Sequence, residues 1–156
     1  MTNLSPLMAA TSSALGWLLW SLLVGSLANR LPAAWLERQH WFWRRPWREQ
    51  PQGFEKRLVI RRWKPCLPDA GHALPNGIAK ASLVGRERRK LERLVLETRR
   101  AELVHLALWL FWTITPLWLP PAGVLINLAF ATAFNLPCLW VQRYNRLRLQ
   151  RLLGKG

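Results

Sequence analysis

The stretch "ETRRAELVHLALWLFW", Glu97 to Trp112, begins with the composition of a charged helix and ends with that of a membrane span. It contains no Gly or Pro, so we expect one helix to continue from the charged half into the apolar half. Glu102 and His105 stand where the composition changes. Ionisable groups at membrane depth are costly and usually face the interior of a helix bundle. These two residues are therefore the first candidates for a functional site.

Charged residues occur in blocks along the chain. Residues 1–29 and 103–142 contain no Lys, Arg, Asp or Glu, whereas residues 30–102 contain 18 basic and all 8 acidic residues. The last 14 residues carry the other 5 basic residues. Apolar stretches of about 20 residues without charge are typical of membrane spans. The pattern predicts a small integral membrane protein.

The net charge of +15 has two explanations. A nucleic-acid partner attracts Lys and Arg to its phosphates, and the segment "HWFWRRPWREQ" (residues 40–50) has the aromatic and basic composition that stacks on bases. Membrane proteins also collect basic residues on the cytoplasmic side and Trp at the interface. Because the basic residues flank the apolar blocks, we predict a lipid bilayer as partner and no nucleic acid. The two cysteines, Cys66 and Cys138, have no metal-ligand spacing, and we predict no metal site.

The apolar blocks predict an all-α integral membrane protein with three transmembrane helices, at residues 8–27, 103–119 and 124–141. Residues 86–102 are predicted to form a cytoplasmic amphipathic helix, because leucines recur at three- and four-residue steps opposite arginines. The run Pro120-Pro121-Ala122-Gly123 predicts a tight turn between the second and third spans.

These elements are expected to form a single membrane domain. It comprises an N-terminal anchor (1–29), a basic cytoplasmic loop with the amphipathic helix (30–102), a transmembrane hairpin (103–141) and a basic cytoplasmic tail (142–156). Since Lys and Arg stay on the cytoplasmic side, we expect a multi-pass protein of the bacterial cell membrane with its N-terminus outside. Ser26-Leu27-Ala28 resembles a signal-peptidase site, but no Lys or Arg precedes the span, which favours an uncleaved anchor.

A hairpin with its tip near residue 120 places residues whose numbers sum to about 240 at similar depth. His105 is then expected level with Asn135, and Glu102 level with Cys138. Polar residues of the two helices should therefore gather near the cytoplasmic interface, where their side chains could meet.

Two interpretations of Glu102 and His105 follow. A carboxylate three residues before an imidazole can orient it and make it a better base, as needed to deprotonate a hydroxyl that attacks a thioester. Alternatively, Glu102 pairs with Arg99 or Arg146 and has no catalytic role. Asn135 likewise either contacts substrate or forms a hydrogen bond between helices.

Two sequence runs resemble one family of small bacterial membrane proteins. The runs are "ETRRAELVH" (97–105), followed by a span, and "NLPCLWVQRYNRLRLQRLL" (135–153), at the end of the next span. They resemble glycosyl-4,4'-diaponeurosporenoate acyltransferases of staphyloxanthin-type carotenoid biosynthesis, and the loop "RRWKPCLPDAGHAL" (61–74) is similar to the Trp-Lys loop of that family. The resemblance covers about residues 55–153. It implies an O-acyltransferase that moves a fatty acyl group to a sugar hydroxyl of a glycosylated carotenoid or similar glycolipid.

The resemblance also implies which residues form the site, and residue chemistry suggests their roles. We expect His105 to be the general base, oriented by Glu102, with Glu97 as a further candidate. The residues implied for substrate binding are Arg143, Arg146, Asn135, Gln142, Asn145, Tyr144, Trp63, Lys64 and Asp69.

Among these substrate-binding candidates, Arg143 and Arg146, assisted by Lys64, suit the phosphates of an acyl donor. Asn135, Gln142 or Asn145 could donate to the oxyanion of the tetrahedral intermediate. We expect no bound cofactor. The co-substrate is expected to be acyl-CoA or an acyl carrier protein thioester.

A non-catalytic membrane adaptor or assembly protein is the competing interpretation. Its basic loop would bind anionic lipid or a partner enzyme, which explains the charge and the tryptophans without chemistry. An adaptor should tolerate loss of the His105 imidazole, whereas the enzyme should not.

Overall fold

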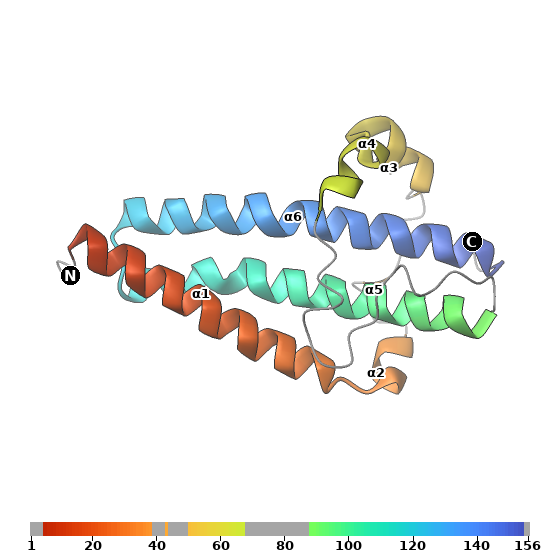
Figure 1. Cartoon of the computed structure of the whole chain (residues 1–156), viewed down its shortest axis with the longest axis horizontal. Helices are drawn as coiled ribbons and strands as arrows, with labels where there is room; N and C mark the ends of the chain where they lie inside the picture. Colours follow the sequence, from red (N-terminus) through yellow and green to blue (C-terminus); the bar gives the residue numbers. More distant parts are fainter. Residues whose placement is uncertain (1–4, 39–42, 44–49, 68–87, 155–156) are drawn as a thin grey trace. The chain divides into compact units, whose positions relative to one another are not determined.

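The computed structural model describes residues 5–38, 43, 50–67 and 88–154, and the predicted all-α class is confirmed for these residues (Figure 1). The α-helices are α1 (Pro6–Asn29), α2 (Ala33–Glu37), α3 (Pro51–Leu58), α4 (Ile60–Trp63), α5 (Arg88–Trp109) and α6 (Pro121–Leu152). Residues Lys64–Cys66 and Leu110–Leu117 form the 3₁₀ helices η2 and η5.

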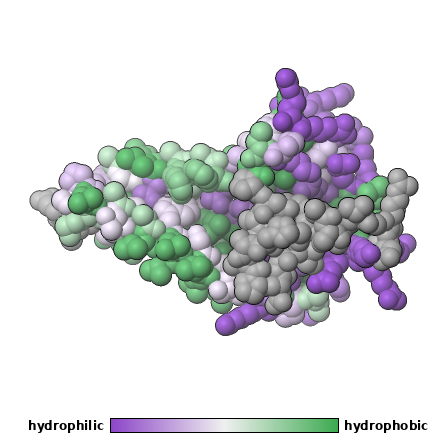
Figure 2. Space-filling view, viewed as in Figure 1, coloured by the Kyte–Doolittle hydropathy of each residue, from purple (hydrophilic) through white to green (hydrophobic). Residues whose placement is uncertain are grey.

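The chain divides into two compact units. Unit 1 spans residues 1–30 and 103–139, and unit 2 spans residues 31–102 and 140–156. These boundaries lie within a few residues of the boundaries between apolar and charged blocks in the sequence. On the face drawn in Figure 2, hydrophobic residues cover much of unit 1, and hydrophilic residues predominate on the described part of unit 2.

Helix α1 of unit 1 contains the first predicted span, residues 8–27. Ser5 caps its N-terminus, since the hydroxyl oxygen accepts a hydrogen bond from the Met8 amide at 3.3 Å, and Pro6 occupies the first helical position. Most leucines of α1 are exposed. Among the described residues, α1 and α6 are the helices that are long and apolar enough to cross a membrane.

The prediction that residues 103–119 form a membrane-spanning α-helix is wrong. Helix α5 continues from the charged residues only to Trp109, and residues 110–117 form the 3₁₀ helix η5. Thr113 and Thr115 donate hydroxyl hydrogen bonds to the carbonyls three residues earlier, which competes with α-helical bonding. Pro116 within the segment has no amide hydrogen to donate. Continuity between the amphipathic helix and the apolar residues after it is confirmed as far as Trp109.

Helix α6 contains the predicted span at residues 124–141 and extends well beyond it. It passes through Pro137 and ends at Leu152, so most of the predicted basic tail is helix. Gly154 follows with φ +69°, the left-handed conformation that ends many helices, and its amide bonds the Arg151 carbonyl at 3.0 Å.

An aromatic cluster holds α1 against η5 in unit 1. The buried ring of Phe111 has its centroid 4.7 Å from that of Trp17 and 6.0 Å from that of Trp20. Gly16 permits this approach, because a Cβ atom there would lie 2.7 Å from the Phe111 ring. Aromatic side chains bury large areas, so this cluster stabilises the contact between the two helices.

The core of unit 2 joins α3 and α4 to the second half of α6. Phe54 and Ile60 pack in one buried cluster with Val141, Tyr144 and Leu147. Val59 links α3 to α4 with φ 49°, a conformation that is unusual for a β-branched residue. The chain turns at Val59, so that Ile60 packs into the core. Arg61 follows in the first turn of α4.

Candidate active site

His105 and Asn135 meet in unit 1. His105 Nδ1 lies 3.2 Å from Asn135 Oδ1, and Asn135 Nδ2 donates to the carbonyl of Ala131 at 3.0 Å. The second bond fixes which end of the amide faces the imidazole. Since Oδ1 only accepts, Nδ1 of a neutral His105 carries the hydrogen and the lone pair lies on Nε2. The predicted meeting of these residues is confirmed, with Asn135 buried.

Glu102 belongs to unit 2 and contacts two arginines of α6. Its carboxylate forms an ion pair with Arg146, whose side chain is 3% exposed, and lies 3.9 Å from Arg143 Nε. The Glu102–Arg146 pair that the alternative interpretation expected is thus present. A buried pair of this kind is costly to break, because one charge would remain buried without compensation.

Glu97 pairs with Arg100 one turn further along α5. Both carboxylate oxygens lie within 2.7 Å of Arg100 Nη1. Arg100 also extends its other terminal nitrogen to 3.5 Å from the Leu31 carbonyl. Arg100, held by Glu97, thus ties α5 to the chain just before α2.

Three of the substrate-binding candidates, Lys64, Tyr144 and Asn145, meet in unit 2, in a group that we name the Tyr144 cluster. Glu55 and Arg61 are its other members. The buried Tyr144 hydroxyl donates to Glu55 Oε1 at 2.6 Å and accepts from Arg61 Nε at 3.3 Å. Lys64 Nζ donates to Asn145 Oδ1 at 2.6 Å.

Electrostatics keep the Glu55 carboxyl ionised. The hydrogen bond from Tyr144 is the largest cause that lowers its pKa from the ordinary value of 4.5. Partial desolvation raises the pKa by a smaller amount, and the charges of Arg61 and Arg148 lower it further. The same contacts raise the pKa of Arg61, first through Tyr144 and then through Glu55.

The remaining predicted site residues are placed as follows. Trp63 donates its indole hydrogen to the Leu58 carbonyl at 2.7 Å and packs on the core of unit 2. Arg143 is one-third exposed, and Gln142 precedes it on α6, half-buried. Asp69 lies outside the described residues. Within the described residues, no group of three His, Cys, Asp or Glu side chains could hold a metal ion.

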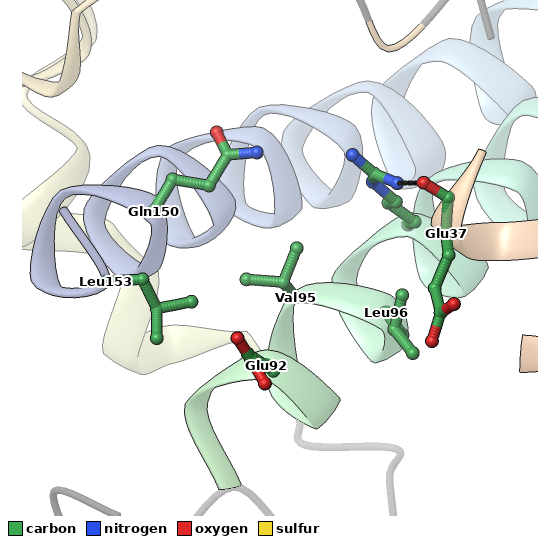
Figure 3. Close-up of a pocket in the computed structure, with 7 residues that line it drawn as sticks. Glu37, Glu92, Val95, Leu96, Gln150 and Leu153 are labelled. Atoms are coloured by element: carbon green, nitrogen blue, oxygen red, sulfur yellow. Dashed lines mark hydrogen bonds between the residues drawn. The ribbon is translucent and has the colours of Figure 1, made fainter. Parts of the chain in front are cut away.

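A pocket of about 370 Å³ lies in unit 2 between α2, α5 and the end of α6 (Figure 3). Residues that line it are Glu37, Glu92, Val95, Leu96, Arg99, Gln150 and Leu153. The buried Arg99 donates to the carbonyls of Leu36 and Glu37 at 2.5 and 3.1 Å, so it satisfies the C-terminal end of α2. Burial, followed by repulsion from Arg146, lowers the pKa of Arg99. Arg99 thus shapes the pocket wall while it holds α2.

Several contacts were not predicted from the sequence. Trp17 donates to Asn127 Oδ1 at 2.9 Å, and Trp20 donates to the Ala107 carbonyl at 2.9 Å. Asn127 could have been found, because it is one of the few amides in the apolar block. The contact of Arg61 with Tyr144 had no signal in local sequence, because the two residues lie far apart along the chain. The same holds for the contacts of Arg99 with the carbonyls of Leu36 and Glu37.

Comparison with known proteins identifies the family. A sequence model described as glycosyl-4,4'-diaponeurosporenoate acyltransferase matches residues 38–155. The chain belongs to this family. The match includes residues 38–54, which the motif resemblance did not cover, and it confirms the predicted family and, with it, the class of enzyme.

Individual relatives of the acyltransferase family agree with this match. Proteins named glycosyl-4,4'-diaponeurosporenoate acyltransferase from Staphylococcus aureus strains bovine RF122 / ET3-1 and MRSA252 are each 31% identical over 143 residues. The alignments cover 88% of this chain and 83% of each relative. The protein of strain USA300 is 30% identical over the same length. No solved structure matches the chain.

Proposed function

We propose that this acyltransferase moves a fatty acyl group from a thioester donor to a sugar hydroxyl of a glycosylated carotenoid. The observation that carries the proposal is the family match over residues 38–155, together with relatives whose names specify this acceptor. An acceptor that is a similar glycolipid would need the same chemistry.

His105 is the general base in this proposal. Its contact with Asn135 favours the tautomer with the lone pair on Nε2, which can take the proton of a sugar hydroxyl. Asn135 is a positioning residue, because its oxygen faces the imidazole and its nitrogen already donates to Ala131. Glu102 is engaged with Arg146, which favours a structural role over the orientation of His105.

The reaction is balanced as an acyl transfer. The hydroxyl oxygen attacks the thioester carbonyl carbon while His105 Nε2 accepts the hydroxyl proton. The tetrahedral intermediate collapses, the C–S bond breaks, and the sulfur leaves as a thiolate that takes a proton from the imidazolium. The products are an ester on the sugar and a free thiol.

A membrane location is part of the proposal. Exposed hydrophobic side chains cover α1, for example Leu18, Leu19 and Leu22, and others lie on α6, for example Leu125 and Phe134. Exposed apolar area of this extent is typical of a lipid-facing surface. We place the N-terminus outside the cell and the basic segment that follows α1, residues 30–102, in the cytoplasm, following the positive-inside rule.

The native Cys66 offers a test of this orientation, because it is exposed in unit 2. A Cys138→Ala variant would carry this thiol alone. A membrane-impermeant maleimide should label it in inverted vesicles and leave it unlabelled in intact spheroplasts. Labelling from the outside would contradict the proposed orientation.

The test of function is mass spectrometry of pigment extracts from cells that make glycosylated carotenoid and this protein. Wild type should yield a species heavier by one acyl group, and His105→Ala should lose it. Trp17→Phe is the matched control, since it also removes one side-chain hydrogen bond between helices of unit 1. It should retain acylation at an equal level of protein in the membrane.

Three outcomes would count against parts of the proposal. Acylation that survives His105→Ala would refute His105 as the base. Equal loss in Trp17→Phe would indicate damage to the fold instead. No product from wild type, with acceptor and acyl-CoA both confirmed present, would refute this acceptor and favour the adaptor interpretation.

A further inference from the structure

Three basic side chains converge on the ring of Tyr144. Arg61 Nε lies 3.3 Å from the hydroxyl oxygen, Lys64 Nζ lies 5.5 Å from the ring centroid, and Arg148 Cζ lies 5.6 Å from it. They come from α4, η2 and α6 of unit 2. Positive charges gathered around one ring repel one another unless a negative group lies among them.

Glu55 supplies part of that negative charge. Its carboxylate pairs with Arg61 at 2.7 Å and accepts the Tyr144 hydroxyl at 2.6 Å, and its lowered pKa keeps it charged. The Arg61 side chain is nevertheless 67% exposed, and Arg148 is also exposed. Both guanidinium groups can therefore reach a further anion without losing the contacts that hold them.

We propose that Arg61 and Arg148, with Lys64 beside them on Tyr144, bind a phosphate group of the acyl donor. This inference rests on the proposed function, because it names the chemical class of the donor: a thioester that bears phosphate, such as coenzyme A. Guanidinium groups bind phosphate through paired, charge-assisted hydrogen bonds, and the ring holds the cations in place through cation–π contact.

The geometry thus points to a different phosphate site from that expected from sequence. Arg146 was one of the two arginines expected to bind phosphate, but it is 3% exposed and paired with Glu102. A bound phosphate would have to displace that buried pair. Arg61 and Arg148 need no such rearrangement, because they lie at the surface.

The experiment measures binding of coenzyme A to the full-length protein in zwitterionic detergent by isothermal titration calorimetry. Arg61→Gln/Arg148→Gln should weaken binding by about tenfold or more. The control Lys56→Gln/Arg62→Gln removes the same charge from exposed positions of α3 and α4, and should change the Kd by less than about twofold. Arg148→Gln alone, which keeps the Glu55–Arg61 pair, should give an intermediate loss even if the double variant folds poorly.

Equal weakening by both double variants would overturn the inference, because binding would then follow net charge alone. So would a wild type that binds no coenzyme A yet still acylates the carotenoid, an outcome that leaves the proposed function intact. The reverse result, coenzyme A binding lost in Arg61→Gln/Arg148→Gln while wild type forms no acylated product, would support the phosphate site and refute the proposed acceptor.

A lipid headgroup is the other source of phosphate, and nanodiscs separate it from the donor. In phosphatidylcholine discs with added phosphatidylglycerol, wild type should still bind coenzyme A. Loss of coenzyme A binding there, together with less phosphatidylglycerol bound by Arg61→Gln/Arg148→Gln, would assign the site to lipid and overturn the donor assignment.

Discussion

Unit 1 and unit 2 use polar groups in opposite ways. In unit 1, single neutral hydrogen bonds join apolar helices, as between Trp17 and Asn127 or between Trp109 and Thr132 at 3.1 Å. In unit 2, charged groups pair with each other and with aromatic rings, as in the Tyr144 cluster. A charged group costs more free energy in apolar surroundings than a neutral amide does. The apolar composition of unit 1 therefore favours neutral hydrogen bonds, whereas the charged composition of unit 2 allows ion pairs.

The comparison bears on function as well as stability. The titratable group among the described hydrogen bonds of unit 1 is His105, whose imidazole is the side-chain type used most often in general acid–base catalysis. Unit 2 instead presents arginines that stay charged and suit anions. The two proposals accordingly place proton transfer in unit 1 and phosphate recognition in unit 2.

The largest expected effect is in the buried ion pair of unit 2. Glu102→Gln would leave Arg146 buried without its carboxylate and should lower the free energy of unfolding by about 3 to 5 kcal/mol. Chemical denaturation in detergent micelles measures this. The double variant Glu102→Gln/Arg146→Met should recover part of the loss. A double variant less stable than Glu102→Gln would show that the two residues do not act as a pair.

The next effect tests apolar packing in unit 1. Gly16→Val should lower the free energy of unfolding by about 1 to 3 kcal/mol, because the new side chain meets the buried Phe111 ring. Thermal unfolding followed by tryptophan fluorescence measures this, with Gly53→Val as a control, since a Cβ atom at Gly53 meets nothing within 4 Å. Equal destabilisation by both variants would mean that packing on Phe111 is not responsible.

A smaller effect concerns the turn between α3 and α4. Val59 has φ 49°, which costs a residue with a branched side chain about 1 to 2 kcal/mol. Val59→Gly removes this strain but loosens the unfolded chain by a comparable amount, so the net change should lie within about 1 kcal/mol of zero. Val59→Ala, which keeps a Cβ atom, is the comparison. Strong destabilisation by glycine would contradict the strain argument.

The smallest effect is a pH dependence that Glu55 of unit 2 should contribute. Because the folded state lowers the pKa of Glu55, its contribution to stability is present above the ordinary value of 4.5. That contribution is lost as the pH falls through the lowered pKa. Thermal midpoints between about pH 6 and about pH 3 should therefore fall less steeply for Glu55→Gln than for wild type. Identical slopes would show that the pair is fully screened by solvent.

Much of the fold was predictable because it follows from composition along the chain. Charge-free apolar blocks predicted the helices α1 and α6, and the absence of Gly and Pro between Glu97 and Trp112 predicted that α5 continues from charged into apolar residues. The segment 103–119 was mispredicted because hydropathy does not register backbone competition by Thr113 and Thr115. The length and hydropathy of the apolar block therefore could not predict that residues 110–117 form the 3₁₀ helix η5.

The site was predictable in part. Depth matching across a hairpin predicted the contact of His105 with Asn135, because it needs only the helical rise and the position of the turn. It placed Glu102 level with Cys138, whereas the carboxylate contacts Arg143 and Arg146. Long side chains reach across more than one turn, so a register based on backbone depth misassigns them.

The sequence by itself determined the helical class, the alternation of apolar and charged blocks, and the family, because each depends on residue types in order along the chain. Tertiary structure decided which ionisable groups neutralise one another. It brought Arg61 and Lys64 to Tyr144 and paired Glu102 with Arg146. Those choices depend on distance and burial, which fix electrostatic energies and which a linear sequence does not contain.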